Sequence, residues 1–189
     1  MVRRATLNDI NHLVKLHLEN LQDGLLYRLG KNTLSCFYKE AIMDNSCFVF
    51  LFCEESRILG VAASSDDSFS FFGKVKKKYF FTIAYDLMRI LFFDISLLFK
   101  LMNQGKYPMF PKSELMMLYV ENSKRSKGIG KKLIEAANSE YKYRGVNIFK
   151  ITILSDNLSG RKFYEKSGFL FKGDFFYMQE KRSIYYLTT

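Results

Sequence analysis

The residues best suited to chemistry surround a short loop, Arg125-Ser126-Lys127-Gly128-Ile129-Gly130. Glycines at the start of a helix let the backbone approach a ligand closely and leave several N–H groups without a partner, and the helix dipole adds positive potential there. No acidic residue lies between Ser123 and Lys132. Five basic residues lie in or beside the loop: Lys124, Arg125, Lys127, Lys131 and Lys132. The loop therefore predicts a seat for a diphosphate.

Three kinds of phosphate loop compete for this sequence. A dinucleotide fingerprint needs a third glycine where Leu133 stands, and a P-loop needs Gly-Lys-Ser/Thr where this loop reads Gly130-Lys131-Lys132. A second run, from Gly24 to Thr33, has the wrong spacing for a P-loop and follows a predicted helix rather than a strand. The remaining pattern is Arg/Gln-x-x-Gly-x-Gly/Ala, which the loop matches.

With this loop the chain resembles the Gcn5-related N-acetyltransferase (GNAT) superfamily, whose diphosphate loop has that form. The surroundings are similar too: a strand at Leu115–Val120 precedes the loop, and Asn157 and a run ending Gly168-Phe169 follow it. Arg4-Ala5-Thr6 is similar to the family's opening strand. The resemblance covers residues 114–169 most closely, residues 1–64 less closely and residues 66–109 not at all.

The resemblance implies acetyl-CoA as the acyl donor. It also implies that backbone groups of the loop bind the diphosphate, that a strand edge contacts the pantetheine arm and the acetyl carbonyl, and that an asparagine contacts the arm. In this sequence those residues are Arg125, Ser126, Lys127, Gly128, Ile129 and Gly130 for the loop, Leu118, Tyr119 and Val120 for the strand, and Asn157 for the arm.

Tyr164 is the first catalytic candidate. A phenol titrates near pH 10, so it is protonated at neutral pH and can donate to a departing thiolate, the role that a tyrosine here commonly has in the family. The alternative is a tyrosine packed beside Phe163 with its hydroxyl satisfied.

The general base is less defined. Some family members carry a glutamate where this chain has Thr152, and others carry one where Glu114 stands. At the wall of a partly dry cleft, Glu114 could accept a proton through water. Two alternatives stay open: Glu114 is an exposed carboxylate at the end of a strand, or the acceptor amine is neutral enough to need no strong base.

The leading hypothesis is an N-acyltransferase that moves acetyl directly to an amine of a small molecule, such as an amino sugar. By analogy, residues 22–32 and 74–108 would shape the acceptor pocket. A catalytically silent CoA-binding protein is the first alternative. The second is a nucleic-acid-binding module, prompted by 29 Lys+Arg against 19 Asp+Glu, a net charge of +10. No nucleic-acid-binding motif supports it, so no nucleic acid partner is expected.

The fold class follows from the order of apolar patterns. Helices are expected at 5–20 and from Asn32, a hairpin at 47–53 and 58–64, and then strands at 115–120, 148–154, 169–179 and 183–187 with helices at 128–143 and 158–166 between them. This predicts one α/β domain over residues 1–189. The expected sheet is GNAT-like, mixed and mostly antiparallel, flanked by helices, with a helical insertion at about 74–105.

The stretch from Tyr79 to Met102 is the one membrane candidate. Four charged residues interrupt it, each costing about 2.5–3.5 kcal/mol at mid-bilayer, so no span is expected. We predict a helix with one buried apolar side and one polar side, and surface docking on a membrane as the alternative. The polar side is Asp86, Arg89, Phe93, Ser96 and Lys100, and the buried side is Phe80, Ala84, Leu87, Leu91, Ile95 and Leu98. Lys74 to Lys78 is expected to precede the helix as a solvated entrance.

The remaining reactive residues predict little chemistry. His12 and His17 are five apart and are expected to be ordinary helix residues, and with three cysteines and no CxxC pair no metal site is expected. Cys36, Cys47 and Cys53 fall in apolar runs and are expected to fill the core. The odd cysteine count and the absence of an apolar stretch after Met1 predict a cytoplasmic protein, and a homodimer is left open.

Overall fold

A seven-stranded sheet forms the centre of the computed structural model, which describes residues 1–22, 24–55, 57–103 and 105–189. The strand order is β1-β2-β3-β4-β5-β7-β6, and every neighbouring pair is antiparallel except β4 and β5. This confirms the predicted mixed, mostly antiparallel sheet. The strands are β1 (Val2–Arg4), β2 (Cys47–Glu54), β3 (Arg57–Ser65), β4 (Glu114–Val120), β5 (Ile148–Leu154), β6 (Leu170–Tyr177) and β7 (Glu180–Thr188).

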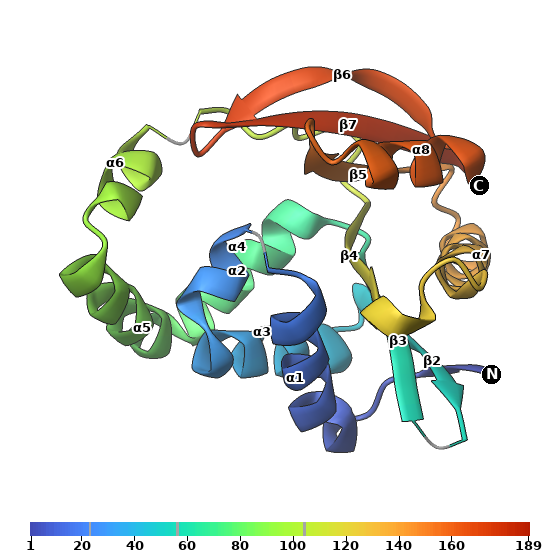
Figure 1. The fold of residues 1–189 in the computed structure, drawn as a ribbon, viewed down its shortest axis with the longest axis horizontal. Helices are drawn as coiled ribbons and strands as arrows, with labels where there is room; N and C mark the ends of the chain where they lie inside the picture. Colours follow the sequence, from blue (N-terminus) through green and yellow to red (C-terminus); the bar gives the residue numbers. More distant parts are fainter. Residues whose placement is uncertain (23, 56, 104) are drawn as a thin grey trace.

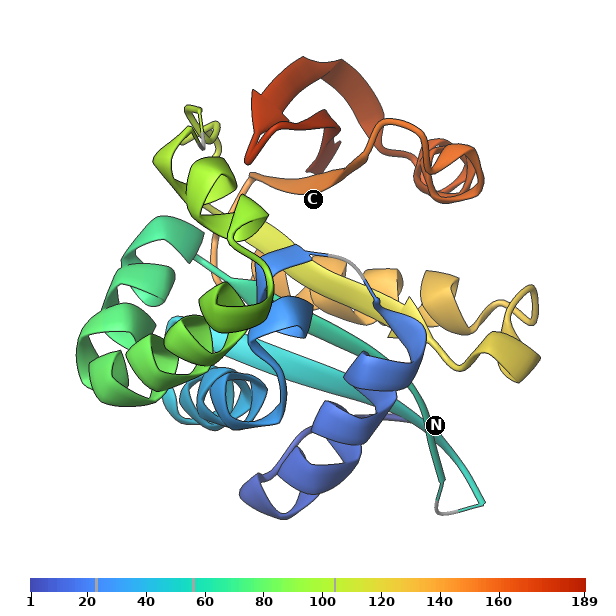
Figure 2. The same ribbon diagram turned by 60° about the vertical axis from the view of Figure 1, so that its left-hand side comes forward.

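Helices cover both faces of the sheet (Figures 1 and 2). Two hydrophobic clusters fill the spaces between the layers: one lies under α1, α3 and α4, and the other lies under α7 and joins it to β5, β7 and α8. The helices are α1 (Ile10–Asn20), α2 (Gly24–Leu29), α3 (Lys31–Met43), α4 (Ser68–Lys78), α5 (Phe80–Phe93), α6 (Ser96–Met102), α7 (Ile129–Tyr143) and α8 (Leu158–Lys166), with 3-10 turns η1 (Leu7–Asp9) and η2 (Asn122–Lys124).

The N-terminal elements differ from the prediction at their ends. The expected helix at 5–20 is η1 followed by α1, because the Asp9 carboxylate accepts hydrogen bonds from the Thr6 N–H and from Arg3 and stops the first turn. Helix α2 was not predicted, and residue 23 lies outside the described residues. Helix α3 begins one residue before the expected cap, after Gly30 at φ 87°.

The predicted hairpin is present as β2 and β3, although residue 56 of its turn lies outside the described residues. In the C-terminal half the predicted elements are confirmed. Strand β5 and helix α8 have the expected limits, and β4, α7, β6 and β7 differ from them by no more than three residues at either end. Buried residues recur at the strand period in β4 and at the helix period in α7, so periodicity identifies these two elements.

The insertion holds three helices over residues 68–102 in place of the one expected helix and the limits 74–105. Lys74 to Lys78 lies inside α4, where the last bases face the carbonyl end of the helix dipole, so it is not an entrance to a helix. The expected helix at 79–102 is broken at Asp94, whose carboxylate accepts a hydrogen bond from the Ser96 N–H, 3.0 Å away.

The predicted faces of α5 are correct only in part: Ala84, Leu87 and Leu91 are half-buried, on the side expected to be buried. Asp86, placed on the polar side, is fully buried because its carboxylate binds Thr33 at the start of α3. Phe80 and Ile95, placed on the buried side, are exposed. The hydrogen bonds of this buried carboxylate to α3 outweigh the burial of apolar side chains in setting which face of α5 is directed toward the protein. Among the described residues, none of the helices has the length and apolarity needed to cross a bilayer.

Candidate active site

Strands β4 and β5 diverge from a single point of contact. Among the described residues their only register pair is Glu114 with Lys150, next to a hydrogen bond of 2.9 Å from the Lys150 N–H to the Ser113 carbonyl. Beyond it β5, β6, β7 and α8 form a layer separated from β4 (Figure 1). Beyond Glu114, the edge of β4 that faces β5 therefore makes no register pair with β5 among the described residues, and we call this divergence of the two strands the fork.

The direction of the β4 backbone groups follows from the β3–β4 pairing. The Glu121 N–H donates to the Leu59 carbonyl on β3, 2.8 Å away. Because backbone groups alternate sides along a strand, those of Leu118 and Val120 point toward β5, and those of Tyr119 point toward β3. The Tyr119 side chain is buried and its hydroxyl donates to the Leu13 carbonyl. Two of the three predicted strand residues thus direct main-chain groups toward the fork.

The predicted diphosphate loop joins β4 to α7 and has the expected backbone geometry. Ser126 and Gly128 have φ of 62° and 77°, a left-handed conformation that turns successive N–H groups toward one side. Gly128 is the N-cap of α7, and no side chain caps the helix. Arg125, Ser126, Lys127 and Gly128 are exposed, while Ile129 is buried in the core. The free amides of this loop and its bases can hold a dianion.

The two glycines of the loop have different structural roles. A Cβ on Gly128 would meet no atom within 4 Å, so this position is limited only by its left-handed φ. A Cβ on Gly130 would lie 2.9 Å from the ring of Phe163, so Gly130 allows α8 to pack closely against the start of α7. The first glycine shapes the loop, and the second brings α8 beside it.

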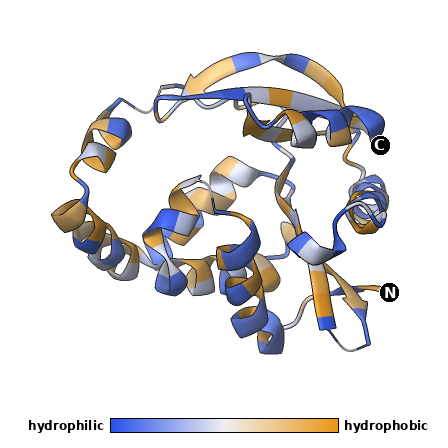
Figure 3. Ribbon diagram, in the orientation of Figure 1, coloured by the Kyte–Doolittle hydropathy of each residue, from blue (hydrophilic) through white to orange (hydrophobic). Residues whose placement is uncertain are grey.

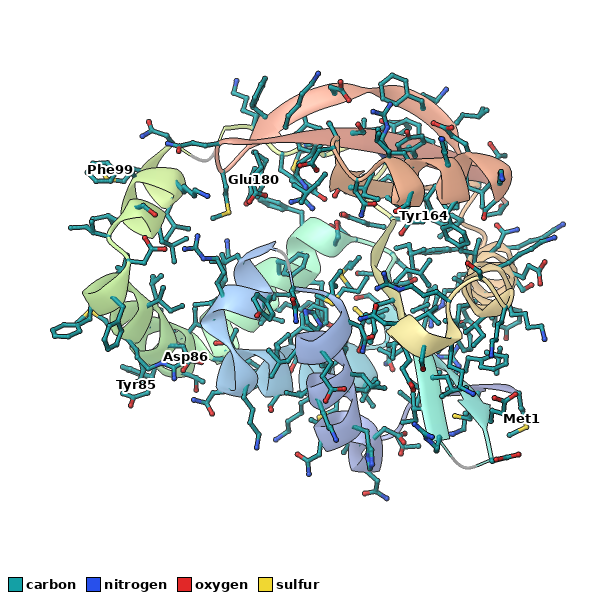
Figure 4. The ribbon with its side chains drawn as sticks, in the orientation of Figure 1. Met1, Tyr85, Asp86, Phe99, Tyr164 and Glu180 are labelled. Carbon is teal, nitrogen blue, oxygen red and sulfur yellow. The ribbon has the colours of Figure 1, made fainter. Side chains whose placement is uncertain are left out.

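Helix α8 carries two predicted site residues. The Asn157 Oδ1 caps the helix by accepting a hydrogen bond of 2.9 Å from the Gly160 N–H. Tyr164 is half-buried against the cluster under α7 and packs edge-on against Phe163 and Phe169, at ring distances of 5.3 and 5.4 Å. Figure 4 shows Tyr164 on the side of α8 that faces β4 and α7. Tyr164 therefore faces the elements that the predicted diphosphate loop joins.

Glu114 is buried at the closed end of the fork. Its side chain accepts hydrogen bonds from the hydroxyls of Ser68, at 2.6 Å, and Tyr107, and it lies 3.8 Å from the Lys150 Nζ. Only 4% of the residue is exposed, so it is not an exposed strand-end carboxylate. The Tyr107 hydroxyl also lies 3.0 Å from the Thr152 Oγ1. Tyr107 thus connects Glu114 and Thr152, the two positions considered above for the general base.

Sequence reasoning missed the partners of Glu114. Lys150 is 1% exposed, donates to the Pro108 carbonyl at 2.6 Å, and has a lowered pKa because burial disfavours its charge. Burial and the neighbouring Glu114 raise the pKa of Tyr107 well above its usual value, so the phenol stays protonated. A lysine inside the apolar run of β5 is a signal that could have indicated a buried ion pair, whereas nothing in the sequence singles out Tyr107.

The histidines and cysteines do not gather at the fork. His17 is 1% exposed, and its Nδ1 lies 2.8 Å from the hydroxyl of Tyr38, which in turn lies 3.0 Å from that of Tyr119. Burial lowers the pKa of His17 to about 4. Cys47 is buried in the core as expected, and Cys36 and Cys53 are half-buried. The described ranges contain no cluster of three His, Cys, Asp or Glu side chains that could hold a metal.

Comparison with known proteins gives a family match for part of the chain and a fold match for all of it. Residues 107–183 match the family described as an acetyltransferase (GNAT) domain. No curated protein sequence matches the chain.

Among solved structures, a ribosomal-protein-alanine N-acetyltransferase from Brucella melitensis aligns with a TM-score of 0.66 at 16% identity, covering 100% of this chain and 99% of that one. The PaiA N-acetyltransferase from Thermoplasma acidophilum, solved in complex with coenzyme A, aligns with a TM-score of 0.64 at 14% identity, with coverages of 100% and 98%. YncA of Salmonella typhimurium, described as a putative acetyltransferase with its cofactor acetyl-CoA, gives 0.64 at 14% identity, with coverages of 100% and 92%. At these identities the alignments establish the fold.

Proposed function

Since the chain has the GNAT fold throughout and a GNAT acetyltransferase domain at residues 107–183, we propose that it transfers acetyl from acetyl-CoA to the amine of a small molecule. The observation that carries the proposal is the fork between β4 and β5, with an uncapped, glycine-shaped helix start at its mouth. A thioester on a long phosphorylated arm needs both an open strand edge for the arm and an anion seat for the diphosphate.

The residues of this chain fit that donor. The amides at the start of α7 and the bases Lys127 and Lys131 would bind the diphosphate, and the Leu118 and Val120 main chain would hydrogen-bond the arm and orient the carbonyl. Asn157 would contact the arm through the part of its amide that does not cap α8. When bound, acetyl-CoA supplies an activated acyl group whose thiolate leaves as the amine adds.

Tyr164 is the proposed general acid. Its support is its place on α8, which Gly130 allows to pack against the start of α7, and a phenol that is protonated at neutral pH. A positioned proton donor typically contributes about 10²–10⁴-fold to a rate.

Glu114 is the proposed general base, acting at a distance. Its carboxylate is sealed from solvent, but Tyr107 lies within hydrogen-bond distance of both Glu114 and Thr152. A proton taken from the amine at Thr152 could pass along these hydroxyls to Glu114, each group giving up one proton as it receives another. An acceptor amine that is already neutral would bypass this route.

The acceptor is proposed to be small because the insertion and the segment after it are held against the N-terminal helices and β6. Arg28 of α2 forms an ion pair with Asp94 at the end of α5, so the insertion is tied to the N-terminal helices. At its other end, the Tyr107 ring packs edge-on against Phe175 and Tyr177 of β6. A segment fixed at both ends on the acceptor side suits an amino sugar or similar amine better than an extended protein tail.

The experiment is to incubate the purified chain with acetyl-CoA and a panel of amines and to measure released thiol. We expect release that depends on one class of amine and on Tyr164. If no amine of the panel causes thiol release but CoA stabilises the chain against heat, a catalytically silent CoA-binding protein is favoured instead. The burial of Glu114 is consistent with that alternative. Neither stabilisation nor release would contradict both.

A further inference from the structure

The helical insertion exposes a continuous stripe of large apolar side chains. Phe81, Tyr85, Met88 and Phe92 of α5 are 85%, 67%, 71% and 84% exposed. Their spacing of four, three and four residues places them on one side of the helix. Figure 4 shows Tyr85 pointing away from the rest of the molecule, while Asp86 next to it points inward. The stripe is therefore an outward face and not the edge of a core.

The stripe continues onto α6. We call the whole set the α5–α6 surface, and in Figure 1 its two helices form the side of the molecule farthest from α7. Figure 3 shows hydrophobic residues along both helices. Proteins that stay monomeric in water rarely expose so large an apolar set, which marks a docking face. Its residues are Phe80, Phe81, Tyr85, Met88, Phe92, Phe93, Ile95, Leu98, Phe99 and Met102.

The charge around this surface is mostly positive. Residues 68–112 contain eight Lys and Arg and two Asp, a difference of 8 − 2 = +6, and three of these bases, Lys74, Lys78 and Lys112, form ion pairs with acids outside the range. Both acids are neutralised within the protein, Asp86 by the start of α3 and Asp94 by Arg28. Lys76 and Lys77, at the end of α4 and three to five residues before Phe80 and Phe81, are exposed and form no ion pair with any described residue. The surface thus combines aromatic side chains with free bases and offers no free acid.

From this combination we propose that the α5–α6 surface docks on an anionic lipid bilayer. Aromatic and aliphatic side chains on one face with lysines beside them are the features of a helix that lies in the plane of the interface. The 14 residues of α5 are too few to cross a bilayer, so the helix lies on it. A second copy of the chain is a poorer partner, because a two-fold contact would bring two basic rims together.

The test is flotation of the full chain with two kinds of vesicle. One is made of phosphatidylcholine alone, and the other also contains about 40% phosphatidylglycerol as the anionic lipid. We expect binding to the anionic vesicles that weakens with salt, and little binding to the neutral ones. Phe81→Ser with Phe92→Ser should reduce binding at least about tenfold, since each removes apolar surface from the interface. Lys76→Gln with Lys77→Gln should reduce it by about tenfold as well.

The matched control is Lys142→Gln with Tyr143→Ser, which removes an exposed base and an exposed aromatic side chain from α7 on the far side of the molecule. It should leave binding unchanged. Folding of each variant is checked by circular dichroism, and the exposed positions chosen should not alter it. The proposal is overturned if the folded wild type does not float with anionic vesicles, or if the α7 control loses as much binding as the α5 variant. It is also overturned if the wild type binds no vesicles but forms a dimer in sedimentation that only the α5 variant abolishes.

Discussion

The strand, loop and helix of residues 114–143 and the helical insertion of residues 68–102 differ in where their apolar side chains lie. In the first, Leu115, Leu133 and Ile134 are buried, and what remains exposed is largely backbone and bases. In the second, most large apolar side chains of α5 and α6 face outward, and the buried side chains of these two helices are Asp86 and Leu97. A site made of main-chain groups needs particular residues at fixed spacing, whereas a surface made of side chains needs only a composition.

The largest effect is expected at Tyr164, beside the main-chain site of the first region. Tyr164→Phe should lower turnover by about 100-fold or more, because it removes a proton donor, while leaving CoA affinity within about threefold. Steady-state kinetics and a CoA titration measure the two effects separately. Tyr143→Phe, on the exposed side of α7, serves as the control and should behave as wild type. Equal turnover in the Tyr164 variant would show that another group donates the proton.

The second prediction concerns the network that ties the insertion to the fork. Glu114→Gln should lower the free energy of unfolding by about 3–5 kcal/mol, because the buried Lys150 loses its counter-charge. Combining it with Lys150→Met should restore most of that loss, since the pair is then removed together. Denaturant unfolding measures both. A loss below about 1 kcal/mol in the single variant would mean that the network does not hold the two regions together.

The third prediction uses the lowered pKa of His17. The unfolded chain takes up a proton on this side chain below about pH 6.5, and the folded chain does so only below about pH 4. Stability from this group is therefore complete above pH 6.5 and falls as the pH drops toward 4, by about 3 kcal/mol in all.

Chemical denaturation at several pH values tests this dependence. His17→Gln should flatten the curve between pH 4 and 6.5, and His12→Gln, at an exposed position, should not. The same slope in wild type and in the His17 variant would refute the assignment.

The smallest effect is expected at the anchor of the insertion. Asp86→Ala should cost about 2 kcal/mol, because the buried Thr33 N–H at the start of α3 loses its acceptor. Asp94→Ala should cost less than Asp86→Ala, since its ion pair with Arg28 is partly exposed. Thermal or denaturant unfolding compares them. If the two variants are equally stable, α5 is not held by Asp86.

The sequence predicts the two regions unequally for a physical reason. The loop at Arg125–Gly130 and helix α8 could be located because their glycines, cap and aromatic residues satisfy local backbone requirements. The orientation of α5 could not, since Asp86 makes its contacts with Thr33, 53 positions away. Likewise Glu114 could be identified as a candidate, but its partner Tyr107 could not, because their contact depends on how the end of the insertion packs on β6.

The central claim is that main-chain amides at the start of α7 bind the diphosphate of a CoA thioester. Calorimetric titration of acetyl-CoA into wild type, Gly128→Asn and Gly128→Asp tests it most directly, because both substitutions tolerate the left-handed φ and meet open space, and only one adds a negative charge. We predict binding by wild type and by the asparagine variant, and a loss of at least about tenfold in the aspartate variant, since a carboxylate repels the diphosphate. No binding by wild type, or equal affinity for the two variants, would contradict the account.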